Sequence, residues 1–176
     1  MVVVVGAVLI GLAIRPHGAR TISAPDATFE APAEWSHTSG STGIVKDPSF
    51  PTATWEENFL RDPVDVILVA KLKGEIAVGP DDFHAHLEVI KAGMVEGLRQ
   101  AGATLEAGPT ETEFDGLPGL EVRIERPTPT GEEARSRLVL GFSGSDQYLI
   151  RCQFDENHED EVLDACQHVI DTFHRT

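Results

Sequence analysis

The sequence predicts an α+β domain in which two amphipathic helices pack on a mainly antiparallel sheet of about six strands. Three observations carry this prediction. Apolar residues recur at every second position across much of residues 109–154, as in strands that bury one face. Residues 81–101 and 158–174 instead carry one apolar stripe each with helical spacing. Residues 64–73 are apolar at their centre without alternation, which is typical of a strand covered on both faces.

Length and charge narrow the class of protein. The chain has 176 residues and is 41% hydrophobic, which suits one domain with a substantial core. Its 14 basic and 29 acidic residues give a formal net charge of -15. Because this charge repels phosphate backbones, we expect no nucleic-acid partner. Acidity of this kind otherwise serves solubility and indicates no particular function.

Residues 1–23 are predicted to be an N-terminal apolar segment of the signal or anchor kind, ahead of a single domain at residues 24–176. The uncharged run at residues 2–14 has 13 residues, whereas a membrane-spanning helix needs about 20. It therefore predicts a secreted or membrane-anchored protein, on the extracytoplasmic side. Two alternatives stay open: the run is a buried first strand, or Arg15 and Arg20 behind it keep the domain cytoplasmic.

In the first half of the domain the elements are short until the central strand. A strand is expected at residues 28–31, and the Ser-, Thr-, Gly- and Pro-rich residues 36–54 predict a loop with at most a short strand at residues 44–46. Residues 55–60 are read as a single helical turn. The apolar strand at residues 64–73 follows, near the middle of the sheet.

The start of the first long helix is predicted at Gly79-Pro80-Asp81-Asp82. Proline there lies where its missing N–H costs least, and the two acids lie at the positive end of the helix dipole. Gly93 and Gly97 each cost about 1 kcal/mol relative to alanine in a helix interior, so we expect close packing or fraying there. The apolar stripe consists of Phe83, Leu87, Ile90, Met94 and Leu98.

A meander of four strands is expected from residue 109 onward. The strands are residues 109–114, 120–126, 134–142 and 147–154. Even-numbered positions of the last three carry apolar side chains and are predicted to form one core face. The last two strands share that face if their turn has three residues, Gly144 to Asp146. The C-terminal helix turns Val162, Cys166 and Val169 inward, and both helices are expected to cover one face of the sheet.

The odd-numbered face of the meander carries three arginines on neighbouring strands, Arg123, Arg137 and Arg151. Guanidinium groups brought together in an acidic protein can bind a carboxylate or phosphate, so these are the candidate ligand-binding residues for a small anionic molecule. The alternative is cross-strand ion pairing with Glu121 and Glu125, which contributes ~0.2–1 kcal/mol per pair on a solvated face.

Cys152 and Cys166 both lie on apolar faces that are predicted to pack together. Their spacing allows a disulfide, which an oxidising compartment would favour. A reduced pair in the core suits the residue type and its burial equally well.

No metal, cofactor or catalytic residue is predicted. His84 and His86 are two apart and point ~200° away from each other on a helix, which leaves only His84 and Glu88 to meet, and two ligands are not a site. The acidic run at residues 155–161 matches no calcium loop and suits helix capping. The chain also contains no GxSxG nucleophile motif.

These patterns resemble the PsbP/Mog1-like superfamily, in particular the small actinobacterial lipoproteins of the LpqN type. The matching stretches are TFEAPAEW, VDVILVAKL ahead of a long helix, FDGLPGLEVRI, and DQYLIRCQF with EDEVLDACQHVIDTFH. The resemblance covers most of residues 26–175 and includes no catalytic signature. It implies an α/β/α sandwich about a central antiparallel sheet, exported and anchored at the membrane, with binding or accessory roles. The chain departs from those lipoproteins in lacking the lipid-attachment cysteine.

The favoured function is a non-enzymatic binding or interaction module of the cell envelope. It would be exported or held at the membrane by its N-terminal segment, with an unknown protein or a small anionic molecule as partner. One alternative is a hydrolase-like enzyme with a site in residues 36–54. Another is a structural subunit of an envelope complex, for which a contiguous exposed apolar patch would be the sign.

Overall fold

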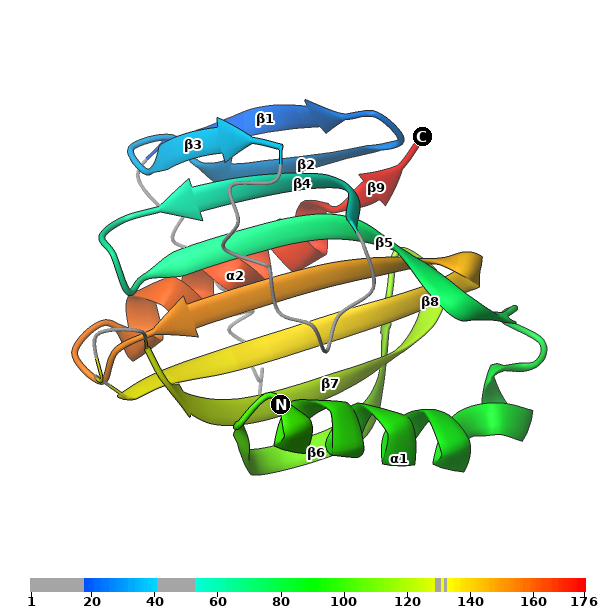
Figure 1. Ribbon diagram of the computed structural model, residues 1–176. Coiled ribbons are helices and arrows are strands. Elements are labelled where there is room, and N and C mark those ends of the chain that lie inside the picture. The colour runs from blue at the N-terminus through cyan, green and yellow to red at the C-terminus, as the bar shows by residue number, and fades with distance from the viewer. Residues whose placement is uncertain (1–17, 41–52, 129–130, 132) are drawn as a thin grey trace, which may run out of the picture.

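In the part of the chain that the structure describes, the fold consists of two antiparallel sheets and two helices. Figure 1 shows their arrangement in a computed structural model. The structure describes residues 18–40, 53–128, 131 and 133–176. The strands are β1 (Ala19–Ala24), β2 (Ala27–Pro32), β3 (Ser36–Ser39), β4 (Ala53–Leu60), β5 (Val66–Val78), β6 (Thr104–Phe114), β7 (Leu117–Pro127), β8 (Glu133–Phe154) and β9 (His174–Arg175), and the helices are α1 (Phe83–Gln100) and α2 (Glu159–Thr172). The large sheet has the order β3-β4-β5-β8-β7-β6, and the small one β1-β2-β9.

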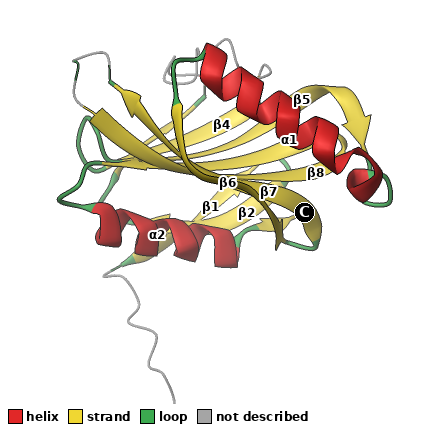
Figure 2. Ribbon diagram, turned by 90° about the horizontal axis from the view of Figure 1, so that it is seen from below, coloured by secondary structure: helices red, strands yellow, loops and turns green. Residues whose placement is uncertain are grey.

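The two helices cover opposite faces of the large sheet, as Figure 2 shows from below. Val162 and Val169 of α2 share one core cluster with Ile67 of β5. Leu98 of α1 shares another with Leu68, the next residue of β5. The predicted strand covered on both faces and the α/β/α sandwich are therefore confirmed. The expectation that both helices lie on one face is wrong, because successive residues of β5 point to opposite sides and both sides are apolar.

Strand β8 folds back on itself, so the large sheet has seven lengths of strand. Its first length pairs with β7 and its second with β5, and Figure 1 shows the two, yellow and orange, side by side. Leu138 and Leu149 share the cluster on the α1 side, whereas Val139 and Ile150 share the one on the α2 side. Even-numbered residues in the first part of β8 thus lie on the same face of the sheet as odd-numbered residues in the second part. This arrangement requires a turn with an even number of residues between the two parts. The single even-numbered core face is wrong.

Strand β4 replaces the helical turn predicted for residues 55–60. Trp55 and Phe59 point into the core on the α2 side, and β4 pairs with both β3 and β5. The alternation was masked by Glu57, a polar residue that is nonetheless buried and lies on the same side of β4 as Trp55 and Phe59. The short strand expected at residues 44–46 lies outside the described residues.

The N-terminal part of the described chain is also extended. Residues 19–23, which the sequence assigned to the N-terminal segment, belong to β1 and pair with β2. The run at residues 2–14 lies outside the described residues. Among the residues that are described, neither helix combines the length and the apolar composition that crossing a membrane requires.

Candidate functional site

An open cleft lies between α1 and the large sheet. Its cavity volume is about 220 Å³, and the side chains around it come from α1, β5, β7 and β8. Gln147 is the one polar residue lining it, within the described part of the chain. Leu72, Met94, Leu138 and Leu140 are among the apolar ones. A concave apolar surface with a single side-chain amide has the composition of a small-molecule site.

The cleft exists because α1 carries little bulk on one side. Gly93 and Gly97, one turn apart, both border it, and a Cβ added at Gly93 would meet no atom within 4 Å. Close packing and fraying were the two outcomes predicted for these glycines, and both are wrong for Gly93. The helix is not frayed, because α1 continues through Gly93. The glycine is not closely packed, because the space beside it is open. Val89, four residues earlier on the same row of the helix, is 69% exposed.

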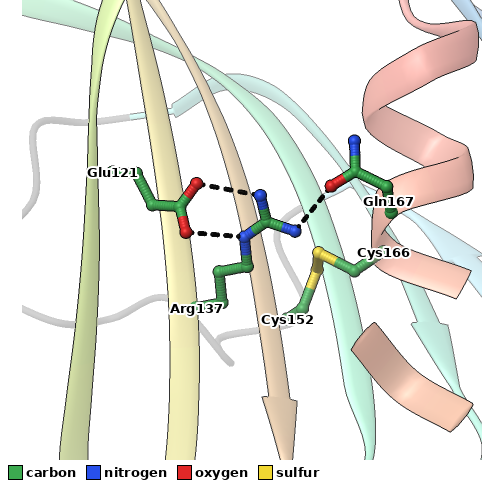
Figure 3. The surroundings of a disulfide bond; sticks show 5 residues. All are labelled: Glu121, Arg137, Cys152, Cys166 and Gln167. Carbon is green, nitrogen blue, oxygen red and sulfur yellow. Dashed lines mark hydrogen bonds and ion pairs between the residues drawn. A yellow bond between two sulfur atoms is a disulfide. The ribbon is translucent and has the colours of Figure 1, made fainter. Parts of the chain in front are cut away.

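Two of the three predicted arginines lie together. Arg123 and Arg137 are direct cross-strand partners in β7 and β8. Arg137 donates two hydrogen bonds to the Glu121 carboxylate, at 3.0 and 2.8 Å, and a third to the side-chain oxygen of Gln167 on α2, at 2.9 Å (Figure 3). Arg123 lies 3.8 Å from the Glu159 carboxylate. The charge of Arg137 is therefore matched within the protein, as the ion-pairing alternative described.

Arg151 does not join them. It lies opposite Leu68 of β5, on the side that α1 covers, and it is 7% exposed. Its guanidinium donates to the side chain of Gln153. The even-length turn within β8 is the reason, because it places odd-numbered residues of the second length on the face opposite Arg123 and Arg137.

Cys152 and Cys166 form a disulfide that ties β8 to α2 (Figure 3). Their Cα atoms are 6.0 Å apart, within the usual range for bonded cysteines. Both side chains are fully buried in the cluster beneath α2. Of the two arrangements open to the sequence, the structure contains the bonded one.

The histidine pair on α1 does not converge. His84 is 75% exposed and lies 3.4 Å from Glu111 of β6, whereas the Nδ1 atom of His86 lies 3.0 Å from the carbonyl oxygen of Asp82. A different group brings ligand atoms together: Asp62, Asp65 and His158 place one each within 4.8 Å of one another. The sequence patterns did not predict this group, because Asp62 and Asp65 lie in or next to a turn and His158 precedes a helix far away in the sequence.

The described part of residues 36–54 offers no nucleophile with its base. The Ser39 hydroxyl donates to the Glu57 carboxylate at 2.6 Å, and His37 contacts the same carboxylate at 2.7 Å. Serine and histidine thus share an acceptor rather than contacting each other, whereas nucleophilic catalysis needs the histidine on the serine oxygen. Residues 41–52 lie outside the described chain.

A partly buried network of charged and polar side chains links the small sheet to the large one. Asp26, in the turn between β1 and β2, accepts hydrogen bonds from Lys71, Trp55 and Tyr148. Burial alone would raise the pKa of Asp26, but these hydrogen bonds and the charge of Lys71 outweigh it, and the pKa is lowered. The pKa of Lys71 is raised: burial opposes this, and hydrogen bonds to Asp26 and Asp146 outweigh the burial.

Comparison with solved structures places this geometry among known folds. Cyanobacterial PsbP (CyanoP) from Synechocystis sp. PCC 6803 matches with a TM-score of 0.58 and 14% identity, over 93% of this chain and 96% of that one. LpqN of Mycobacterium tuberculosis, described as involved in cell envelope biogenesis, matches with a TM-score of 0.52 and 11% identity, over 90% and 91%. The fold is PsbP/Mog1-like. The resemblance seen in the sequence is therefore confirmed at the level of the fold.

The remaining comparisons add no function to the PsbP/Mog1-like fold. A crystal structure from Bacteroides thetaiotaomicron VPI-5482 matches with a TM-score of 0.48 and 12% identity over 85% of this chain, which spans 45% of that longer protein. A likeness at that level supports no conclusion. No protein-family model matches the sequence, and no curated protein matches it.

Proposed function

We propose that this protein is an exported, non-enzymatic binding domain of the cell envelope, and that it holds a small apolar molecule or a single acyl chain in the cleft beneath α1. The observation that carries the proposal is the cleft itself, about 220 Å³ in volume and lined by apolar side chains. Concave surfaces lined mainly by apolar side chains are where proteins most often hold small molecules. The Gln147 amide in the lining provides a donor and an acceptor for the polar end of a ligand.

The mouth of the cleft favours entry from solvent. Gly93 is exposed and leaves the helix without a side chain there. Val89, the one large apolar side chain that is strongly exposed among the described residues, lies one turn away along the same row of α1. An apolar molecule would therefore meet an apolar approach.

Export is supported by two features of the chain. The Cys152–Cys166 disulfide suits an oxidising compartment. The apolar run at residues 2–14 has the length of a signal-peptide core, and we assign to it either export or attachment at the membrane. LpqN, which has the same fold, is described as involved in cell envelope biogenesis.

The two other functions considered have less support. A hydrolase needs a base on its nucleophile, and Ser39 and His37 do not supply that pair. A structural subunit would expose a contiguous apolar patch, whereas Val89 stands alone as a strongly exposed large hydrophobic residue in the described chain.

Fluorescence titration with 1-aminoanthracene, a neutral apolar probe, tests the proposal. The wild-type protein should bind the probe saturably. Gly93→Leu, which places a side chain at the mouth of the cleft, should weaken binding roughly tenfold or more, as expected for ~1.4 kcal/mol or more of lost interaction. Ala92→Leu adds the same side chain at an exposed neighbouring position outside the lining and should bind like the wild type. Equal binding by the wild type and Gly93→Leu would contradict the proposal.

A further inference from the structure

Two carboxylates are held in place by the backbone where β4 turns into β5. Oδ1 of Asp62 accepts hydrogen bonds from the backbone N–H groups of Val64, at 2.8 Å, and Asp65, at 2.9 Å. Oδ1 of Asp65 accepts one from the backbone N–H of Asp155, at 3.2 Å. Each carboxylate therefore has one oxygen fixed by the main chain, which orients its other oxygen, Oδ2, with little freedom left to the side chain.

The two Oδ2 atoms converge on His158, the residue that precedes α2. Its Nδ1 atom lies 2.8 Å from Oδ2 of Asp65 and 3.9 Å from Oδ2 of Asp62. That nitrogen is buried and yet makes no hydrogen bond, so the short distance to Asp65 does not satisfy it. Ligand atoms around one zinc ion, each about 2.0–2.2 Å from the metal, lie roughly 3.3–3.6 Å apart in a tetrahedral arrangement. The observed separations bracket that value.

The charges around this cluster leave it negative. Asp65 is fully buried, and a third carboxylate, that of Asp155, lies 3.3 Å from the same His158 nitrogen. Arg61 donates a hydrogen bond of 3.4 Å to Oδ2 of Asp65, and its other terminal nitrogen lies closer, at 3.1 Å, to Glu161. One guanidinium that is shared with Glu161 does not balance the carboxylates of Asp62, Asp65 and Asp155, and charge that is incompletely balanced is costly to bury. A divalent cation would supply the missing charge.

We propose that Asp62, Asp65 and His158 bind a divalent transition-metal cation, with zinc as the best match. Two carboxylate oxygens and one imidazole nitrogen form a mixed ligand set that zinc accepts and that disfavours magnesium, which seeks an all-oxygen octahedron. With three protein ligands, a fourth position stays open for water or a partner's ligand. The ion would clamp the β4–β5 turn to the start of α2. This site is separate from the cleft beneath α1 and needs no ligand there.

Calorimetric titration of the full chain, freed of metal with a chelator and then desalted, tests the site with zinc chloride as the probe. We expect one saturable zinc site per chain, weaker binding of manganese, and no binding of magnesium. His158→Ala should weaken zinc binding roughly tenfold or more, since losing even an outer-shell partner costs 10–100-fold. Asp62→Asn should do the same while keeping its Oδ1 acceptor for the turn.

A matched control separates this site from other histidines. His84→Ala, on the exposed side of α1, should bind zinc like the wild type. At one zinc concentration, zinc should also raise the melting temperature of the wild type and of His84→Ala more than that of His158→Ala or Asp62→Asn. Absence of saturable binding, or equal zinc affinity in the wild type and His158→Ala, would overturn the proposal and would leave the cleft beneath α1 unaffected.

Discussion

Opening the Cys152–Cys166 disulfide should lower the free energy of unfolding by about 3 kcal/mol. The bonded cysteines are 14 residues apart. A cross-link that closes a loop of roughly 15 residues removes conformational entropy from the unfolded chain, worth about 3 kcal/mol at 25 °C. Both side chains are buried between β8 and α2, so their packing persists in the reduced protein. Because domains are stable by only about 5–15 kcal/mol, this loss is a large share of the total.

Urea unfolding with and without a phosphine reductant measures this difference. With a denaturant dependence of about 2 kcal/mol per molar urea, the midpoint should fall by roughly 1.5 M on reduction. The Cys152→Ala/Cys166→Ala double variant has no bond to open and should show no shift with reductant. If alkylation shows both thiols free in the reduced wild type while its midpoint stays within about 0.3 M of the oxidised protein, the loop-entropy reasoning fails.

Two further predictions concern the small sheet and the glycines. Asp26→Asn removes the shared acceptor of Lys71, Trp55 and Tyr148 and should cost about 1–3 kcal/mol at pH 7. The pKa of Asp26 is lowered in the fold from its usual 3.8, so its ionised form contributes stability that is complete well above that pH and lost as the pH falls through the folded value. Urea midpoints below about pH 4 should therefore change less steeply in Asp26→Asn, and an unchanged acid dependence would refute this role. A Cβ at Gly119 would lie 2.5 Å from the Leu140 carbonyl oxygen, so Gly119→Ala should destabilise by about 1–3 kcal/mol. Gly93→Ala, with open space around it, should instead stabilise by ~0.5–1 kcal/mol, and thermal melts that move in the same direction for both variants would contradict the packing.

Periodicity predicted the helices well because each has one apolar stripe and a clear start. The stripe from Phe83 to Leu98 packs on the sheet as expected. Of the buried residues of α2, the sequence indicated Val162, Cys166 and Val169 but not Ala165. The predicted bounds of both helices, residues 81–101 and 158–174, lie within two residues of the observed ones at each end.

The faces of the sheet could not be assigned from alternation alone. Leu138 and Val139, adjacent in the chain, are both buried, one beneath each helix. Where both faces of a sheet are covered, apolar residues occur at even-numbered and at odd-numbered positions alike. The length of the turn in β8 then decides which residues of its two parts lie on the same face. The separation of Arg151 from Arg123 and Arg137 follows from that one turn.

The charge clusters were beyond sequence reasoning for a different reason. Asp62 and Asp65 meet His158 only because the β4–β5 turn packs against the start of α2. Asp26 similarly meets Lys71 and Tyr148 through the docking of the small sheet. Such contacts depend on tertiary packing between distant segments, and no local pattern reports them.

The measurement that most directly tests the cleft beneath α1 as the binding site is a titration of the isotope-labelled protein with 1-decanol, followed by amide chemical shifts. We predict shifts concentrated at Gly93 and Gly97 of α1 and at the residues of β7 and β8 that line the cleft, among them Leu138 and Leu140. Because 1-decanol is uncharged, it is not attracted to the arginine side chains by their charge. Shifts centred on α2 and Arg137, or no saturable shifts at all, would contradict the assignment.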